Sequence, residues 1–242
     1  MAEFDSYARD YEALHGERVR VSGFPASHFD EYKIVEVARQ IERAGWRDRP
    51  IKFLNFGCGI GKSERYVRER LPAADIYGVD VSARSIEAAR ERNRDLASVT
   101  FAVSDGESIP FDTEFDVVFV ANVFHHIPRA AHGRLLRVLR GVLRDGGLLF
   151  LFEHNPLNPV TVKTVRACAF DEGAVLLPPW YARGILREAG FAHSTINFTL
   201  FFPAPLARLA PLEKYLRKLP FGAQYYCLAR AGETSPPTRT DL

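Results

Sequence analysis

Residues 51–80 of the chain read IKFLNFGCGIGKSERYVRERLPAADIYGVD, and this stretch decides the fold. An apolar run at 51–56 ends in a glycine cluster at 57–61, and a helical pattern follows it. A second apolar run, at 76–79, then ends on Asp80. This order predicts a strand, a tight turn, a helix and a second strand, which together form a right-handed βαβ unit.

The glycine cluster predicts a nucleotide-binding turn. Gly57, Gly59 and Gly61 let the backbone bend sharply and let a ligand approach it, because glycine has no Cβ. The N-terminus of the following helix offers free N–H groups to a negative group. Asp80 is placed to accept hydrogen bonds from ribose hydroxyls. The unit is therefore expected to bind an adenosine-containing cofactor.

The glycine spacing separates the candidate cofactors. A dinucleotide fingerprint needs its third glycine at position 62, where the chain has Lys62. A Walker A loop needs a glycine at position 56, where the chain has Phe56. The remaining pattern, NFGCGIG at 55–61, resembles motif I of the class I S-adenosylmethionine-dependent methyltransferases, an acidic residue followed by x-G-x-G-x-G. Asn55 stands where that family usually has the acid.

The resemblance extends over about residues 30–231. A helix is predicted from about 30 to 45, and further apolar runs lie at 99–103, 115–120, 148–152, 191–202 and 222–230, separated by helical patterns. The resemblance implies an α/β fold, a Rossmann-like seven-stranded methyltransferase sheet with helices on both faces and the last strand antiparallel. It also implies S-adenosyl-L-methionine as the cofactor.

The chain is expected to divide into three parts. Residues 1–30 form an N-terminal helical segment, in which Tyr11 either packs on the main domain or, as part of a lid, reaches the cofactor. Residues 31–231 form the methyltransferase domain, with an insertion at 156–177 and a helical excursion at 204–219. The polar, proline-containing residues 232–242 predict a disordered tail.

The resemblance also implies the cofactor-binding residues. An acid after the third strand often contacts the adenine in this family, and Asp105 is expected to do so rather than Glu107. The alternative is that Asp105 is a turn residue, because Asp-Gly is a common turn pair. The predicted cofactor-binding residues are Tyr11, Asn55, Gly57, Cys58, Gly59, Gly61, Asp80, Val81, Asp105, Gly106 and Asn122.

Candidate catalytic groups follow the fourth and fifth strands. Methyl transfer requires a well-positioned acceptor, and a hydroxyl acceptor also requires a base. The predicted catalytic residues are His126, Glu153 and His154, with Glu153 orienting the imidazole of His154 and His125 less favoured. In the structural alternatives, His126 packs under the cofactor and Glu153 anchors the insertion. No metal site is expected, because no set of side chains has ligand spacing.

Composition limits the partners and the compartment. The 242 residues, 47% of them apolar, suit one α/β domain, and a net charge of +2 implies no polyanionic partner such as nucleic acid. Three cysteines without metal spacing favour a reduced, cytoplasmic protein. The acidic N-terminus lacks the apolar core of a secretory signal, and no apolar run approaches the ~20 residues of a membrane span.

The expected function is methyl transfer to a small-molecule acceptor, namely a sugar, a lipid-linked saccharide or a secondary-metabolite intermediate. The polar insertion at 156–177 is the predicted acceptor-recognition element. The basic amphipathic segment 204–219 meets a membrane surface, packs on the sheet or contacts a second subunit of a homodimer. Two alternatives remain: a catalytically silent partner subunit that binds the cofactor, and a nicotinamide-dependent oxidoreductase, which the glycine spacing disfavours.

Overall fold

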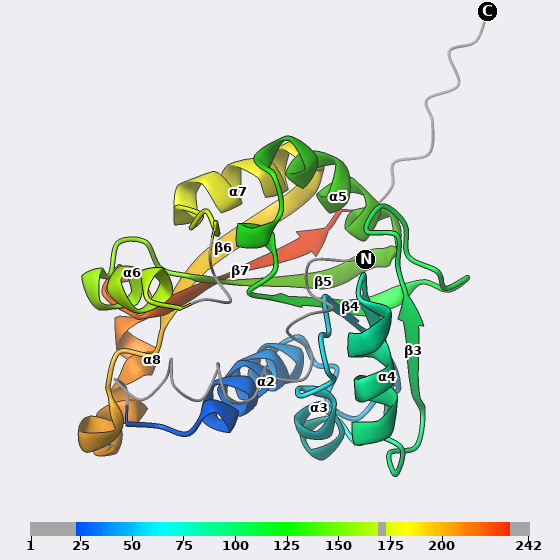
Figure 1. The fold of residues 1–242 in the computed structure, drawn as a ribbon, viewed down its shortest axis with the longest axis horizontal. Helices are drawn as coiled ribbons and strands as arrows, with labels where there is room; N and C mark the ends of the chain where they lie inside the picture. Colours follow the sequence, from blue (N-terminus) through cyan, green and yellow to red (C-terminus); the bar gives the residue numbers. More distant parts are fainter. Residues whose placement is uncertain (1–22, 169–172, 233–242) are drawn as a thin grey trace, which may run out of the picture.

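The computed structural model describes residues 23–168 and 173–232, and a seven-stranded sheet forms its centre (Figure 1). The strand order is β3-β2-β1-β4-β5-β7-β6, with β1 to β5 parallel and β7 antiparallel to both of its neighbours. This arrangement confirms the expected methyltransferase sheet. The strands are β1 (Ile51–Phe56), β2 (Ala74–Asp80), β3 (Val99–Val103), β4 (Phe115–Ala121), β5 (Leu143–His154), β6 (Phe191–Thr199) and β7 (Gln224–Ala231).

Helices cover both faces of the sheet, as expected (Figure 1). One face packs against α5 and α7, and the other packs against α2 and α3. None of the described helices is long and apolar enough to cross a bilayer. The helices are α2 (Ala26–Arg43), α3 (Glu64–Arg70), α4 (Ala83–Arg92), η3 (Phe124–His126), α5 (Arg129–Gly141), α6 (Pro159–Arg166), α7 (Pro179–Glu188), η5 (Ala204–Leu212) and α8 (Glu213–Leu216).

The central strands are apolar on both sides because helices cover both sides of the sheet. Successive side chains of a strand point to opposite faces, so Phe53 of β1 packs in the α2 and α3 layer while Leu54 packs in the α5 and α7 layer. Both side chains are fully buried. The continuous apolar runs in the sequence therefore mark the middle of the sheet.

The helical excursion at 204–219 is not one regular helix. It consists of a 3-10 helix, η5, followed by the one-turn helix α8, and Pro211 lies inside η5. Proline donates no backbone hydrogen bond, so a regular α-helix is unfavourable here. Arg217 nonetheless fastens the excursion to α2, because its guanidinium lies 2.8 Å from a carboxylate oxygen of the buried Glu36.

Three expectations lie wholly or largely outside the described residues. These are the structure of the N-terminal segment, the role of Tyr11 and the state of the C-terminal tail. Residues 26–30 of the expected N-terminal part are described, and they form the first turns of α2. The insertion at 156–177 contains α6, which begins at Pro159 after an N-cap at Asn158 that accepts hydrogen bonds from Val160 and Thr161.

Candidate cofactor and acceptor site

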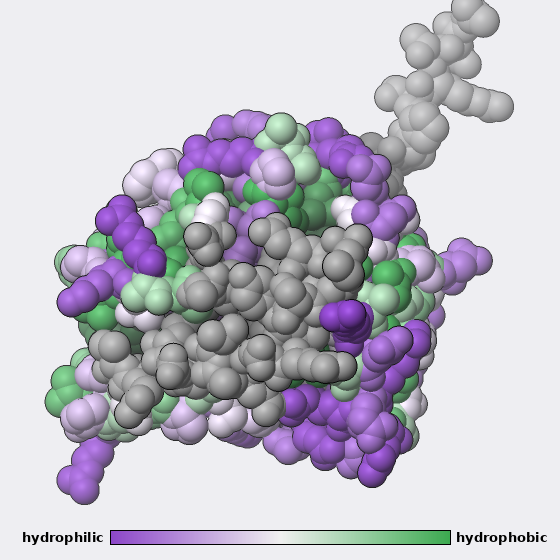
Figure 2. All heavy atoms as spheres, in the orientation of Figure 1, coloured by the Kyte–Doolittle hydropathy of each residue, from purple (hydrophilic) through white to green (hydrophobic). Residues whose placement is uncertain are grey.

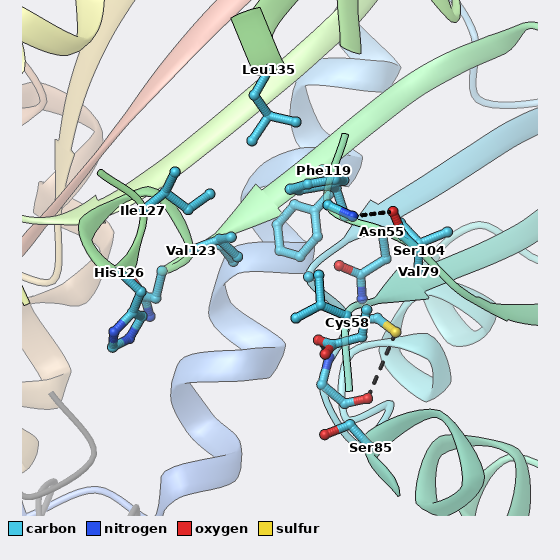
Figure 3. Close-up of a pocket in the computed structure, with 18 of the residues that line it drawn as sticks. Asn55, Cys58, Val79, Ser85, Ser104, Phe119, Val123, His126, Ile127 and Leu135 are labelled. Carbon is cyan, nitrogen blue, oxygen red and sulfur yellow. Dashed lines mark hydrogen bonds between the residues drawn. The ribbon is translucent and has the colours of Figure 1, made fainter. Parts of the chain in front are cut away.

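A cavity of about 280 Å³ lies at the carboxyl ends of β1, β2 and β4. We call this side of the sheet the carboxyl edge. Its strand order reverses between β1 and β4, and such a switch point is where open α/β sheets hold their ligands. The close-up view shows Cys58, Ser85 and Ser104 on one side of the cavity and Val123, His126 and Ile127 on the other (Figure 3).

The glycine loop forms the floor of this cavity. Gly57 has φ +71°, and a Cβ there would come within 2.4 Å of a methyl carbon of Val123. Gly59 has φ +52°, and a Cβ there would meet no atom within 4 Å among the described residues, so its backbone faces open space. The amide of Asn93 fixes the end of the loop by donating to the carbonyl of Gly61 at 2.9 Å. The loop is therefore rigid and open to a ligand.

Asp80 fastens the glycine loop to the end of β2. Its Oδ2 accepts a hydrogen bond of 2.9 Å from the backbone N–H of Gly59, and its Oδ1 accepts one of 2.9 Å from Ser82. Asp80 and Val81 both line the cavity, so the carboxylate lies at the wall that a bound ligand would meet.

A buried pair lies beneath the loop, and sequence analysis identified only one of its members. The side-chain amide of Asn55 donates to Glu64 Oε1 at 2.7 Å, and both residues are buried. Burial raises the pKa of Glu64 to about 7. Its Oε2 has no hydrogen-bond partner among the described residues. The structure therefore places a carboxyl group against the position where motif I usually has its acid.

The sequence offers only one local signal for Glu64. It is the first residue of the helix that follows the glycine loop, and an acid there is favourable near the helix N-terminus. The signal is weak, because most such acids are exposed and only cap their own helix. Nothing in the sequence indicates that Glu64 is buried against Asn55.

The end of β3 does not place Asp105 in the cavity. Its carboxylate is exposed, and Oδ1 accepts hydrogen bonds from the backbone N–H groups of Glu107 at 2.8 Å and Ser108 at 2.7 Å. These bonds hold the pKa of Asp105 below its usual value. In this geometry Asp105 is the turn residue of the alternative interpretation. The neighbouring Ser104, Gly106 and Glu107 line the cavity instead.

Two charged residues of α2, which sequence analysis did not select, line another part of the cavity. Lys33 is only 4% exposed, and its ammonium lies 3.9 Å from the carboxylate of Asp30. At the opposite rim, Glu107 pairs with Arg134 of α5 at 2.7 Å. Asp30 and Lys33 are three positions apart on α2, but local sequence does not show that α2 lines the cavity, because only the tertiary fold brings α2 and α5 to it.

The exit of β4 places two of the predicted site residues, Asn122 and His126, in the cavity wall. Asn122 has φ +58°, which is uncommon for a residue other than glycine, and its backbone N–H donates to Phe152 at 2.9 Å. No partner lies within hydrogen-bond distance of its Oδ1 among the described residues. His126 then follows in the 3-10 turn η3.

Glu153 anchors η3 instead of orienting His154. Its Oε1 accepts from the backbone N–H of Phe124 at 2.9 Å, and its Oε2 lies 2.6 Å from Nδ1 of His125. Both side chains are fully buried. The imidazole of His154 lies 3.5 Å from Gln224 and is not part of the cavity wall. The expected Glu153–His154 pair is therefore replaced by a Glu153–His125 pair, because β5 turns its last side chains to opposite faces.

Within the described ranges, no group of three or more histidine, cysteine, aspartate or glutamate side chains has the geometry of a metal site. The cluster of His125, His126 and His154 is held by ring contacts, with centroid distances of 4.2 Å and 5.3 Å from His125 to the other two. The three rings therefore pack against one another, and His125 is also held by Glu153.

Comparison with known proteins agrees with the fold. Residues 53–147 match the family model of a methyltransferase domain. The chain is 30% identical over 159 residues to the demethylmenaquinone methyltransferase of Thermotoga maritima, which covers 65% of this chain and 62% of that protein. It is 33% identical over 147 residues to a trans-aconitate 2-methyltransferase of Rhodopseudomonas palustris, covering 59% of this chain and 52% of that protein.

A third relative is the phthiotriol/phenolphthiotriol dimycocerosates methyltransferase of Mycobacterium leprae. The two sequences are 34% identical over 127 residues, and the match covers 51% of this chain and 43% of that protein. The magnesium protoporphyrin IX methyltransferase of Synechocystis, solved with bound S-adenosylhomocysteine, superposes with a TM-score of 0.63. That likeness covers 95% of this chain and 96% of that chain at 17% identity, and it shows the shared fold alone.

These matches define the class. Residues 53–147 form a class I S-adenosylmethionine-dependent methyltransferase domain, and the cofactor of this family is S-adenosylmethionine. The similar segments span between about two fifths and two thirds of the length of the curated relatives.

Proposed function

We propose that this protein transfers a methyl group from S-adenosylmethionine to a small-molecule acceptor. The observation that carries the proposal is the hydrogen bond from the backbone N–H of Gly59 to the carboxylate of Asp80. This bond sets a carboxylate and an open glycine backbone side by side in one cavity wall. A nucleoside needs both features, because its ribose presents hydroxyl donors and its bulk requires space without a Cβ. The carboxyl group of Glu64 beside Asn55 supports cofactor binding despite the missing motif acid.

The cavity has a suitable group for each part of the cofactor. Asp80 is the proposed ribose contact, and the segment 104–107 is the proposed adenine contact. Asp30 and Lys33 lie in the cavity wall formed by α2, where their opposite charges suit the ammonium and carboxylate of a methionine moiety. When bound, the cofactor supplies a methyl group that its sulfonium charge has already activated.

His126 is the proposed base for an acceptor that carries a proton. It is the only one of the predicted catalytic residues that lines the cavity (Figure 3), and histidine titrates in the range that such catalysis requires. Glu153 and His125 are proposed positioning residues, because they fix the backbone and the packing of η3 from below. His154 is proposed as a structural residue beside Gln224.

The acceptor is proposed to be a small molecule because the relatives named above are methyltransferases of demethylmenaquinone, trans-aconitate and phthiotriol or phenolphthiotriol dimycocerosates. The insertion that follows β5 remains the proposed acceptor-recognition element, since it begins directly after Glu153 and His154. A cytoplasmic location also remains a prediction.

A paired measurement tests this proposal. Calorimetry with S-adenosylhomocysteine, NAD and ATP is expected to show binding of the first alone, and formation of S-adenosylhomocysteine is then followed over a panel of quinol, tricarboxylate and lipid diol acceptors. His126→Ala should lower turnover at least tenfold with little change in cofactor affinity. Glu153→Gln should lower both turnover and thermal stability, because the buried partner His125 loses its carboxylate. Binding of NAD alone would overturn the assignment.

A further inference from the structure

Two segments that are far apart in sequence form one continuous surface at the carboxyl edge. The first, 156–166, follows the end of β5, and the second, 204–221, connects the end of β6 to the start of β7. Because β5 and β6 are both antiparallel to β7, both segments lie at the same edge. Asn158 joins them by donating to the carbonyl of Phe221 at 2.8 Å, and Thr161 donates to Ala223 at 2.9 Å. We call this surface the carboxyl-edge face.

The carboxyl-edge face concentrates the exposed apolar side chains of the described residues. Eight of the twelve large apolar side chains that are exposed in the described ranges lie on it. Phe221 is 68% exposed and Tyr215 is 73% exposed. Monomeric proteins rarely expose so many large apolar groups together without using them for contact. The eight are Leu157, Val160, Leu206, Leu209, Leu212, Tyr215, Leu219 and Phe221.

The exposed charges of this face are all positive within the part of the chain that the structure describes. The single acid in its two segments, Glu213, is 7% exposed and accepts a hydrogen bond from the backbone of Phe201. A shallow hollow of about 570 Å³ beside α6 is lined by apolar residues together with Lys163 and Arg166. The exposed basic residues of the face are Lys163, Arg166, Arg208, Lys214 and Lys218.

Figure 2 shows hydrophobic side chains interspersed with strongly hydrophilic ones along the left side of the molecule, where Figure 1 places α6 and α8. This mixture is the composition of a membrane-surface element, in which apolar groups enter the headgroup boundary and basic groups attract anionic lipids. A symmetric dimer through this face would set like charges against each other, because a two-fold interface pairs the same patch on both subunits.

We propose that the carboxyl-edge face docks on an anionic bilayer and that the acceptor is an amphiphile taken from that bilayer. The proposal rests on the proposed function for the identity of the reaction. Position supports it, since the segment 156–166 begins two residues after β5, whose Glu153 anchors the turn that carries His126 into the cavity. A bilayer-borne acceptor would therefore approach the cavity from the side on which the protein is docked.

Vesicle sedimentation tests the docking, using the full chain without acceptor or cofactor. The vesicles contain phosphatidylcholine alone or phosphatidylcholine with about one third phosphatidylglycerol. One variant removes two charges, Arg208→Ser with Lys214→Ser, and a matched control removes two exposed charges elsewhere, Arg47→Ser with Arg94→Ser. A third variant, Phe221→Ser, removes an exposed apolar group of the face.

The wild type is expected to bind the anionic vesicles more tightly than the neutral ones, and less tightly as salt is raised. The Arg208 and Lys214 double variant should bind about 30-fold more weakly, as two lost basic contacts predict, and Phe221→Ser should bind several-fold more weakly. The control should bind like the wild type. Equal binding by all variants, equal binding to both vesicle types, or self-association without vesicle binding would overturn the proposal.

Calorimetry with S-adenosylhomocysteine on the same variants separates this inference from the proposed function. If the wild type binds S-adenosylhomocysteine but no vesicles, the docking proposal alone is overturned. Vesicle binding without cofactor binding leaves the docking supported and overturns the assigned reaction. The amphiphilic acceptor is tested by turnover on a lipid diol in anionic vesicles, which the Arg208 and Lys214 double variant should slow and the control should not.

Discussion

The buried carboxyl group of Glu64 makes a quantitative prediction about stability. Burial raises its pKa from 4.5 to about 7, so in the folded protein the ionised form is penalised. The associated stability is fully present below pH 4.5, where the group is protonated in both states, and it is lost as the pH rises through 7. At 1.36 kcal/mol per pH unit, the full loss is about 3 kcal/mol.

The substitution Glu64→Gln isolates this effect. Glutamine has nearly the same shape and keeps an oxygen that can accept from the amide of Asn55, but it cannot ionise. The free energy of unfolding of the variant, relative to that of the wild type, should therefore increase by about 3 kcal/mol between pH 4 and pH 8. Below about pH 4 the two proteins should differ little, because the carboxyl group is then neutral in both the folded and the unfolded state.

Urea unfolding of both proteins across this pH range provides the measurement, since the midpoint and slope give the free energy at each pH. Glu87→Gln, an exposed position on α4, is the matched control and should follow the wild type. If the free energies of unfolding of Glu64→Gln and the wild type change with pH in parallel, the reasoning is refuted. Such a result would show that the carboxyl group ionises in the folded protein at no cost in stability and is not held in an apolar setting.

Three further substitutions test the loop and the excursion. Gly57→Ala should cost about 2 kcal/mol of stability and weaken cofactor binding, since φ is +71° and Val123 lies 2.4 Å from the new Cβ; unaltered melting and affinity would contradict this. Asn93→Ala should lower thermal stability by about 1–3 kcal/mol through two lost buried hydrogen bonds, and an unchanged melting temperature would argue against it. Arg217→Met should destabilise by about 3 kcal/mol, and adding Glu36→Met should recover much of the loss; additive losses would show no coupling.

The fold could be predicted because its signals are local. Continuous apolar runs mark the buried parallel strands, and the glycine cluster at 57–61 marks the turn at the switch point. The antiparallel last strand came from the family resemblance. The form of segment 204–219 was not predicted, because its leucine spacing fits a helix while its prolines prevent a regular one.

A residue's place in the cavity wall was predictable where the residue follows its own strand end, as Asp80, Asn122 and His126 do. It was not predictable where the partner comes from another element. Lys33 reaches the cavity from α2, and Glu64 is buried against Asn55 only because α3 packs under β1. Such pairings depend on tertiary packing, which periodicity and spacing do not encode.

Glu153 illustrates the same limit. Its neighbour in sequence, His154, suggested an acid–imidazole pair, but adjacent residues of a strand point to opposite faces. Its actual partner is the buried His125, which lies 28 positions earlier and faces it from the exit of β4. Because strand side chains alternate between the two faces of a sheet, the sequence could have shown that Glu153 and His154 point apart. It could not have identified His125 as the partner of Glu153.

The most direct test is calorimetric titration of S-adenosylhomocysteine into the wild type, Asp80→Ala and Asp75→Ala. Asp75 is exposed near the opposite end of the same strand and serves as the control. The wild type and the control should bind one equivalent with equal affinity, and Asp80→Ala should bind more weakly by about 1–3 kcal/mol. No binding by the wild type, or equal affinity in Asp80→Ala, would contradict the placement of the cofactor at this loop.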